Sequence, residues 1–409
     1  MKKKRKRSLL LISYDYPPTF TATSLRACFI SRELAALSWD IFVLAARFRK
    51  NADIRGEIVT KGIKNIHRTR RGLLNDIWPA NIGRNSEWMF FALPIAIWKI
   101  ITRKMGVVYT IGYPFISHGI GYVLKKLFPR VIWSVDFVDP WAFHPARDQR
   151  VFSTKIIRKV EEKILALADI IIVNTNATKT LYLDRYSYLP IEDKIKMIPM
   201  GYDKATFASS DEHMIQYSSL KEEFSICFIG TIQGNQNIRP FIEALNGIMT
   251  RNIPVKIYWA GGFSNDSGKQ VARQLLEIPI VKYWPFLSLA EGWAVMRSGR
   301  ILLLPMHTGI QVPAKIYQYL ATDRPILVLK ETEADEGAYM VERYSRGLAI
   351  MNTASEIMQA IVKLYTLWKD QELEKTFIPC RVEQFSWENI SKELNQVINE
   401  TYIKNRNLA

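Results

Sequence analysis

The chain of 409 residues is 48% hydrophobic and carries a formal net charge of +17. It is too long for one ordinary core, so we expect two domains of roughly 200 residues each. The three cysteines, Cys28, Cys227 and Cys380, lie far apart and lack metal-ligand or redox spacing, which argues against a disulfide scaffold or a zinc protein and favours a reducing compartment.

The first half alternates short apolar runs with segments of helical length. We expect strands at 8–13, 41–45, 107–110, 131–135, 170–173 and 196–198, and helices at 24–37, 86–103, 117–127, 153–168 and 177–186. The apolar run at 9–12 is too short for a secretory signal, and no stretch is long enough to span a bilayer. We therefore expect a cytoplasmic protein whose basic start leads into a buried strand.

The second half repeats the alternation after a polar stretch at 203–223. Strands are expected at 224–229, 255–260, 280–283, 301–304, 326–329 and 348–351, and Ser386 is a candidate cap for a final helix. The pattern predicts an α/β protein with two doubly wound parallel sheets. We place the domains at 1–205 and 206–385, with a C-terminal helix at 386–409.

The positive charge is confined to the first domain. Residues 1–205 contain 35 Lys and Arg against 17 Asp and Glu, whereas residues 206–409 contain 21 against 22. Basic runs at 2–7, 68–71, 103–104 and 125–126 accompany the aromatic-rich helix 86–103, a combination that suits an anionic membrane surface. A generally basic surface over buried aromatics is the alternative. Nucleic acid is not expected as a partner, because no nucleic-acid-binding motif accompanies the charge.

The segment 305–327 has the pattern of a phosphate-binding loop and helix. A glycine loop at 306–312 follows one strand, Pro313 opens a helix at 314–321, and another strand follows. Lys315, Gln318 and Tyr319 share one helical face beside free N–H groups, at the sheet edge where ligands of parallel α/β folds bind. An ordinary crossover with a solvated polar face is the other interpretation.

Several motifs together resemble glycosyltransferase family 4 over residues 9–400. They are Y-P-P at 16–18 with Arg26, G-Y-P-F-I-S-H-G-I-G at 112–121, D-F-V-D-P-W at 136–141, E-x6-A-D at 161–169, I-P-M-G-Y-D at 198–203, F-I-G-T at 228–231, I-L-L-L-P at 301–305 and V-P-A-K-I-Y-Q-Y-L-A at 312–321. The resemblance implies a GT-B architecture of two facing Rossmann-like domains, with the C-terminal helix returning to the N-terminal domain. It also implies a nucleotide-sugar donor, retention of anomeric configuration and no metal or separate cofactor. Consistently, the sequence has no Asp-x-Asp pair.

The resemblance also implies site residues. Lys315 and the N–H groups of 309–312 would neutralise the leaving diphosphate, and His118 would lie near the donor sugar, with Asp139 as a third catalytic candidate. The donor-binding candidates are Gly230, Thr231, Arg239, Gly309, Ile310, Gln311, Val312, Pro313, Gln318 and Tyr319. The acceptor-side candidates are Arg26, Ser117 and Trp141.

Some of these residues have a second interpretation. His118 can instead bond backbone at a helix start, Asp139 can cap a turn rather than orient an acceptor hydroxyl, and Trp141 can be a core aromatic rather than a sugar platform. Arg26 is interpreted as an anion ligand rather than a solvated helix residue.

The sequence departs from the family pattern in the donor site. Gln318 and Ile310 stand where carboxylates are common, Thr231 and residue 235 or 236 stand where cations are common, and Val138 replaces an arginine. The predicted function is transfer of a sugar to a membrane-presented, lipid-linked glycan acceptor in surface polysaccharide biosynthesis, by a protein peripheral to the inner face of the membrane. The alternatives are a catalytically impaired binding or partner subunit of the same fold and a sugar-nucleotide epimerase.

Overall fold

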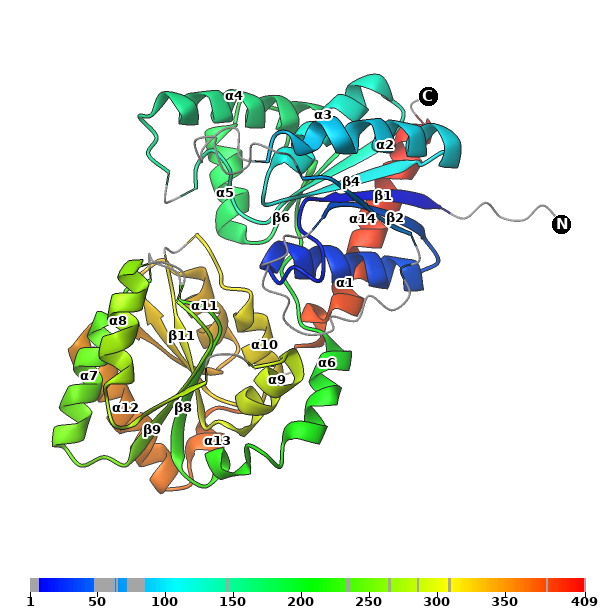
Figure 1. Ribbon diagram of the computed structural model, residues 1–409. Coiled ribbons are helices and arrows are strands. Elements are labelled where there is room, and N and C mark those ends of the chain that lie inside the picture. Colours follow the sequence, from blue (N-terminus) through cyan, green and yellow to red (C-terminus); the bar gives the residue numbers. More distant parts are fainter. Residues whose placement is uncertain are drawn as a thin grey trace. The chain divides into compact units, whose positions relative to one another are not determined.

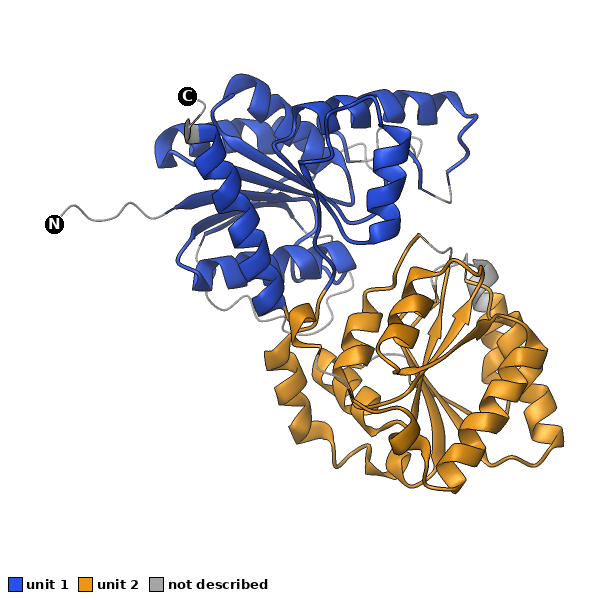
Figure 2. Cartoon of the chain, turned by 180° about the vertical axis from the view of Figure 1, so that it is seen from behind, with its two compact units in different colours: residues 1–200, 387–409 blue, residues 201–386 orange. Residues whose placement is uncertain are grey.

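The computed structural model describes residues 7–47, 63, 65–71, 85–144, 147–232, 236–263, 266–284, 287–307, 310–379 and 382–407. It divides the chain into two compact units (Figure 2). Unit 1 comprises Met1–Met200 and Trp387–Ala409, and unit 2 comprises Gly201–Ser386. The divisions fall close to the expected ones near 205 and 385. The start of the basic run 2–7, Gly309 and Cys380 lie outside the described residues.

Unit 1 is built on a parallel sheet with seven strands among its described residues. They are β1 (Ser8–Ser13), β2 (Asp40–Ala46), β3 (Ile66–Thr69), β4 (Val107–Gly112), β5 (Ile132–Phe137), β6 (Ile170–Val173) and β7 (Ile195–Met197), in the order β3-β2-β1-β4-β5-β6-β7. β3 was not predicted from the sequence, because three of its four residues are polar and the segment was interpreted as part of a basic run.

The helices of unit 1 form a layer on each face of this sheet. They are α1 (Ala22–Ala36), α2 (Trp88–Arg103), α3 (Ile116–Leu127), α4 (Phe152–Leu167), α5 (Asn176–Arg185) and α14 (Trp387–Asn407). Figure 1 shows α2, α3 and α4 on one face and α1 with α14 on the other. Trp387 of α14 stacks on Phe29 of α1, and the indole of Trp39 donates a hydrogen bond to Asn395. The C-terminal helix thus returns to the first domain, as the expected architecture requires.

Unit 2 repeats the design. Its strands are β8 (Phe224–Ile229), β9 (Val255–Ala260), β10 (Val281–Trp284), β11 (Ile301–Pro305), β12 (Ile326–Lys330) and β13 (Gly347–Met351), all parallel, in the order β10-β9-β8-β11-β12-β13. Its helices are α6 (Lys204–Ser209), α7 (Arg239–Thr250), α8 (Asp266–Leu276), α9 (Leu289–Ser298), α10 (Lys315–Ala321), α11 (Glu336–Arg343), α12 (Ala354–Lys369) and α13 (Leu373–Thr376). Three short 3-10 helices, η1 (Ser210–His213), η2 (Ser218–Lys221) and η3 (Glu383–Phe385), complete the unit.

The apolar runs that were expected to be strands form the central part of the core in each unit. All residues of β4, β5 and β6 are buried, as are those of β11, because helices cover both faces of each sheet. Side-chain caps begin several of the helices: Thr21 accepts from the Ser24 amide, and Thr175 accepts from that of Thr178.

The strand order reverses once in each sheet. β1 lies between β2 and β4, and β8 lies between β9 and β11. At such a switch point the loops that leave the carboxyl ends of neighbouring strands diverge, which is where ligands of doubly wound folds bind. The candidate residues are therefore sought at these two edges.

Candidate functional site

The switch point of unit 2 brings Lys315 onto the end of β8. The Lys315 ammonium lies 3.9 Å from the ring centroid of Phe228, one residue before the end of that strand. Gly230, the next residue after β8, has a φ of 131°, and a Cβ atom there would lie 2.8 Å from Lys315 Nζ. A glycine is required because the backbone adopts a conformation that side chains disfavour and because the ammonium occupies the space.

Lys315 is a cation with no counter-charge among the residues that the structure describes. Its side chain is only partly exposed, and its ammonium makes no hydrogen bond or ion pair with the residues that the structure describes. Loss of hydration lowers the pKa of Lys315 from 10.5 to about 7. The Phe228 ring offers some compensation through its quadrupole, but it does not neutralise the charge. An anion that reached this position would gain a poorly hydrated ammonium as its partner.

The loops around Lys315 are fixed by neighbouring side chains. The buried hydroxyl of Tyr319 accepts a hydrogen bond of 3.3 Å from the Ile229 amide and so joins α10 to the end of β8. Gln236 is buried and donates to the carbonyl of Pro305 at 2.8 Å, which joins the loop after β8 to the end of β11. The backbone of Gly230 donates to the Ala260 carbonyl at 2.8 Å. Tyr319 and Gln236 are therefore buried side chains that hold the ends of β8 and β11 and helix α10 in place around Lys315.

The other predicted donor residues lie around this centre at varying exposure. Thr231 is exposed, and Arg239 is exposed at the first position of α7, with no hydrogen bond or ion pair from its side chain to a described residue. Ile310, Gln311, Pro313 and Gln318 are partly buried, and Val312 is buried. No interaction assigns any of these residues to a ligand, so their donor-binding roles stay predictions, as does that of Gly309.

The switch edge of unit 1 holds His118 in the first turn of α3. The imidazole is fully buried, and its Nδ1 lies 3.0 Å from the hydroxyl of Thr110 in β4. The side chain therefore bonds another side chain, not the backbone. Phe137 packs on the ring with centroids 4.7 Å apart. Nε2 has no hydrogen-bond partner in the described part of the chain, and it lies 2.8 Å from the position of a Cβ atom at Gly112.

Burial keeps His118 neutral. The lost hydration lowers the pKa of His118 from 6.5 to about 3. Thr110 also accepts a hydrogen bond of 3.0 Å from the indole of Trp133, so its hydroxyl proton is available to His118 or to the Ser134 carbonyl at 3.4 Å. In either tautomer Nε2 is the ring atom left to bond a ligand, as donor or as acceptor.

Ser117 and Trp141 are close to His118 in the fold. Ser117 is fully buried, and its hydroxyl has no hydrogen-bond partner among the described residues. Trp141 stacks on Phe115, with centroids 4.9 Å apart and planes at 16°, and packs against the core of unit 1. This packing favours the core interpretation of Trp141. Asp139 is partly buried, and its negative charge opposes the lowering of the pKa of His144.

The sequence analysis did not predict that Glu161 joins several segments near this edge of the sheet through hydrogen bonds. Glu161 is fully buried on α4 and accepts hydrogen bonds from the hydroxyls of Tyr182 and Tyr186, at 2.7 and 2.6 Å, and from the Trp141 and Ala142 amides. Burial raises its pKa, and the tyrosine hydrogen bonds oppose that rise. The E-x6-A-D motif contained the residue, but its partners lie in other segments and could not be predicted from the spacing.

Arg26, predicted as an anion ligand, has internal partners instead. It is fully buried and pairs with Asp136 at 2.7 Å, and it donates to the carbonyls of Pro199 and Ile198 at 2.7 and 3.0 Å. The ring of Trp387 lies over its guanidinium, with 6.0 Å to the centroid. This geometry gives Arg26 a structural role and offers no support for its binding of donor or acceptor.

An apolar and basic surface covers the α2, α3 and α4 layer. Exposed hydrophobic side chains on α2 are Phe90 (77% exposed), Phe91, Trp98 (56%) and Ile101, and on α4 they are Phe152 (75%), Ile156 and Val160. Lys155, Lys159 and Lys163 are exposed beside the α4 residues. Trp88 of the same segment is buried and donates to Thr69, so the aromatic-rich helix has one inward and one outward aromatic face.

The described residues contain no helix long and apolar enough to cross a membrane and no group of three or more potential metal ligands among His, Cys, Asp and Glu.

Comparison with known proteins identifies the fold. Over 98% of its length the chain is similar to sucrose-phosphate synthase from Thermosynechococcus elongatus, with 14% identity, a TM-score of 0.71 and 100% of that chain covered. Over 96% it is similar to HepE from Anabaena in complex with UDP, with 12% identity, a TM-score of 0.69 and 100% coverage. The chain has the GT-B fold.

Another structural neighbour has a different activity. UDP-GlcNAc 2-epimerase from Methanocaldococcus jannaschii is 11% identical, with a TM-score of 0.58, over 96% of this chain and 99% of that one. No protein-family model and no curated protein sequence matches the chain. At such identities the neighbours establish the architecture of two Rossmann-like units, whereas activity has to be argued from the residues.

Proposed function

We propose that the protein is a glycosyltransferase that moves a hexosyl group from a nucleoside diphosphate sugar to a lipid-linked glycan acceptor. The observation that carries the proposal is Lys315, a partly buried ammonium without a described anionic partner at the switch point of unit 2. A diphosphate leaving group supplies the missing charge. The GT-B fold supports the proposal, as does HepE, a neighbour solved with UDP and with UDP-glucose.

The reaction is proposed to retain anomeric configuration without a metal ion. The bond between the anomeric carbon and the diphosphate oxygen breaks while the acceptor oxygen bonds that carbon on the same face. The departing diphosphate accepts the acceptor's hydroxyl proton, and Lys315 with the loop N–H groups stabilises its charge. His118, neutral and with Nε2 open, is proposed to hydrogen-bond the donor sugar. Asp139 remains a candidate for orienting the acceptor hydroxyl.

The acceptor is proposed to be presented at the cytoplasmic face of an anionic membrane, in polysaccharide biosynthesis. The support is the exposed surface of α2 and α4, where Phe90, Trp98 and Phe152 are exposed and α4 also carries exposed lysines. Aromatic side chains enter the interfacial region, and each basic residue near an anionic surface contributes about 1 kcal/mol. This is peripheral binding by surface side chains.

Nucleotide binding tests the proposal directly. UDP, GDP and ADP are each added to the protein in a thermal-denaturation series, where a ligand at about a hundred times its Kd stabilises the native state by about 2.7 kcal/mol. We expect one of them to raise Tm and Lys315→Ala to remove most of that shift. Turnover is then followed as radiolabel passing from the matching nucleotide sugar into a membrane lipid extract.

The same series separates the alternatives. A binding or partner subunit is favoured by Gln318 and Ile310, which stand where related enzymes commonly have carboxylates; it predicts no transfer of label. An epimerase, the activity of one structural neighbour, predicts conversion of the free nucleotide sugar without lipid labelling. Unchanged turnover in both Lys315→Ala and His118→Ala contradicts the proposed mechanism.

Vesicle flotation tests the membrane component. The protein should float with vesicles that contain an anionic lipid and fail to float with neutral ones. Phe90→Ser combined with Trp98→Ser should weaken binding, whereas Tyr339→Ser, which alters an exposed aromatic of unit 2, serves as the matched control. Flotation that survives the double substitution and high salt contradicts docking through this surface.

A further inference from the structure

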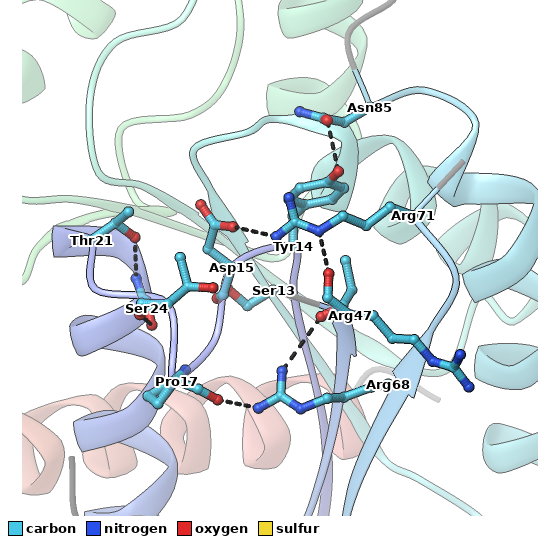
Figure 3. Close-up of polar contacts among 12 residues, drawn as sticks. Ser13, Tyr14, Asp15, Pro17, Thr21, Ser24, Arg47, Arg68, Arg71 and Asn85 are labelled. Atoms are coloured by element: carbon cyan, nitrogen blue, oxygen red, sulfur yellow. Dashed lines mark hydrogen bonds and ion pairs between the residues drawn. The ribbon is translucent and has the colours of Figure 1, made fainter. Parts of the chain in front are cut away.

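Four arginines gather at the carboxyl edge of the first three strands of unit 1. Arg68 lies in β3, Arg70 and Arg71 follow it, and Arg47 follows β2. The parallel register pairs Ala46 with Thr69, so the two strand ends lie side by side. Figure 3 shows the side chains of Arg68 and Arg71 reaching back to the loop after β1. We call Arg47, Arg68, Arg70 and Arg71 the arginine cluster.

Arg71 is held against Tyr14. Its guanidinium carbon lies 4.9 Å from the centroid of that ring, and its Nε donates to the carbonyl of Arg47 (Figure 3). The hydroxyl of Tyr14 donates to Asn85 at 2.7 Å, which fixes the ring beneath the arginine. One Nη atom lies 3.4 Å from a carboxylate oxygen of Asp15. The other, Nη1, makes no hydrogen bond to a described residue and remains available to a ligand.

Arg68 is held in a similar way by Tyr16. Its guanidinium carbon lies 5.8 Å from the ring centroid, and its two Nη atoms donate to the carbonyls of Pro17 and of Ala46. The hydroxyl of Tyr16 lies 2.9 Å from that of Ser31, inside α1. Burial lowers the pKa of Arg68, and the charge of Arg71 lowers it further, while Tyr16 opposes both. Backbone carbonyls orient both guanidinium groups, but they do not cancel the charge.

Among the residues that the structure describes, arginines outnumber carboxylates at this edge. Asp15 is the carboxylate that pairs with the arginine cluster among the described ion pairs, and its contact with Arg71 is long. Arg47 and Arg70 are exposed, and neither side chain has a hydrogen bond or ion pair with a described residue. Two oriented guanidinium groups with two exposed ones beside them suit a phosphate, because guanidinium donors match its oxygens in pairs.

We propose that the arginine cluster binds the phosphate or diphosphate group of the glycosyl acceptor. The proposal rests on the proposed transfer reaction, which requires an acceptor, and it specifies that the acceptor is anionic. Arg71 and Arg68 are the fixed ligands, and Arg70 and Arg47 add charge. The phosphate can come from a lipid diphosphate or from a soluble sugar phosphate.

Pyrophosphate titration calorimetry tests the cluster in the full chain. The measurement is made in a Lys315→Ala background, because Lys315 is the proposed ligand of the donor diphosphate. We expect that adding Arg70→Ala and Arg71→Gln weakens pyrophosphate binding by about tenfold or more. Arg130→Gln, which removes an exposed arginine elsewhere in unit 1, should leave the affinity unchanged. Equal affinity with and without the cluster substitutions overturns the proposal.

Two further measurements keep the result unambiguous. Arg70→Ala alone, which alters an exposed side chain, should still weaken binding in a protein of unchanged Tm, and no change in that variant counts against the proposal. UDP binding is measured on the wild-type protein and on the Arg70→Ala/Arg71→Gln variant. If both proteins bind UDP and the cluster substitutions leave pyrophosphate affinity unchanged, the cluster proposal is wrong and the donor proposal stands. If the wild type does not bind UDP, the donor proposal is wrong and the cluster proposal is unaffected.

Competition identifies the source of the phosphate. Farnesyl diphosphate and glucose 1-phosphate are each added against pyrophosphate in the Lys315→Ala background, with farnesol as the control without phosphate. Competition by farnesyl diphosphate supports a lipid-linked acceptor, and competition by glucose 1-phosphate supports a soluble one. Competition by neither, or equally by farnesol, overturns the assignment to an acceptor.

Discussion

Arg26 in unit 1 and Lys315 in unit 2 are two poorly hydrated cations with opposite surroundings. Arg26 is fully buried and bonds Asp136 and two backbone carbonyls. Lys315 lies over the Phe228 ring with no described anion near it, and its pKa falls to about 7. Both lie in or beside conspicuous motifs, yet of the two Lys315 is the one with no counter-charge among the described residues. A cation whose partners are internal supports the fold, whereas one left without a partner indicates a ligand.

Arg26→Met should have the largest effect on stability. It leaves the buried Asp136 with the Tyr109 hydroxyl, at 2.5 Å, as its side-chain partner among the described residues, and breaking a buried pair in this way costs about 3–5 kcal/mol. Urea denaturation followed by circular dichroism measures the loss. Arg150→Met, which breaks an exposed pair with Asp148, should give no measurable change. A stable Arg26→Met protein that loses only nucleotide or acceptor binding would make Arg26 a ligand after all.

Lys315→Met should weaken nucleoside diphosphate binding by about a hundredfold, the value of one or two charge-assisted hydrogen bonds. Isothermal titration with the nucleotide found to bind measures the loss, and Lys369→Met, at an exposed lysine of α12, is the control. Although Lys315→Met weakens nucleotide binding, it should make the folded protein more stable. Because the folded pKa lies below the unfolded value, the unfolded state binds more protons between about pH 7 and 10.5, so the stability of the wild type rises with pH across that window.

The stability gain from Lys315→Met should therefore be largest near and below pH 7 and vanish toward pH 10.5. We expect about 1 kcal/mol at most, because the side chain is partly exposed and solvent screens its charge. Unfolding curves of the two proteins at pH 6.5 and pH 9.5 check the sign. A variant less stable than the wild type at pH 6.5 would indicate that Lys315 has an internal partner and so would remove the contrast with Arg26.

His118 extends the comparison to a buried base. Its folded pKa of about 3 lies below the unfolded value, so its contribution is present above pH 6.5 and is lost as pH falls from there toward 3. At pH 5 the loss is about 2 kcal/mol relative to neutral pH. His118→Gln should flatten this part of the profile and lower turnover, whereas His67→Gln, at an exposed histidine of β3, should do neither. A flattened profile with normal turnover would leave His118 a structural residue.

Gly230→Ala should have the smallest effect. An alanine is strained at a φ of 131°, which costs about 1 kcal/mol, and its Cβ would displace the Lys315 ammonium. Gly262→Ala is the matched control, because a Cβ there would meet only Thr231 at 3.8 Å. Thermal denaturation and nucleotide titration should both register the first change and not the second. If Gly230→Ala binds the nucleotide as tightly as the wild type, the position of the Lys315 ammonium does not matter for nucleotide binding.

The fold was predictable because both sheets are buried on both faces. Runs such as 9–12, 170–173 and 301–304 are apolar throughout, and each proved to lie in a parallel strand. β3 was not predicted, because this edge strand contains His67 and Arg68 and therefore lacks the apolar pattern that marks the other strands. The helix expected at 24–37 ends one residue earlier, and Leu37 is exposed just past the end of α1, since element ends are poorly marked by periodicity.

The site was less predictable because its contacts are distant in sequence. Lys315 was singled out from its helical face, but its neighbours Phe228 and Gly230 belong to another strand. Arg26 was interpreted as an anion ligand, and the sequence could not show its pairing with Asp136, because that carboxylate lies 110 residues away. Tyr319, placed on the ligand-facing side of its helix, turned inward and bonds the end of β8. A polar residue in a motif cannot reveal whether its partner is inside the chain.

The last helix gives unit 1 a particular order of assembly during synthesis. Residues 201–386 form a continuous unit and can fold on the ribosome as soon as they emerge. Unit 1 must wait for Trp387, which stacks on Phe29 and covers Arg26, and for Asn395, which bonds Trp39. Until then the surfaces of α1 and β5 that α14 covers stay exposed, so the half that is made first is completed last.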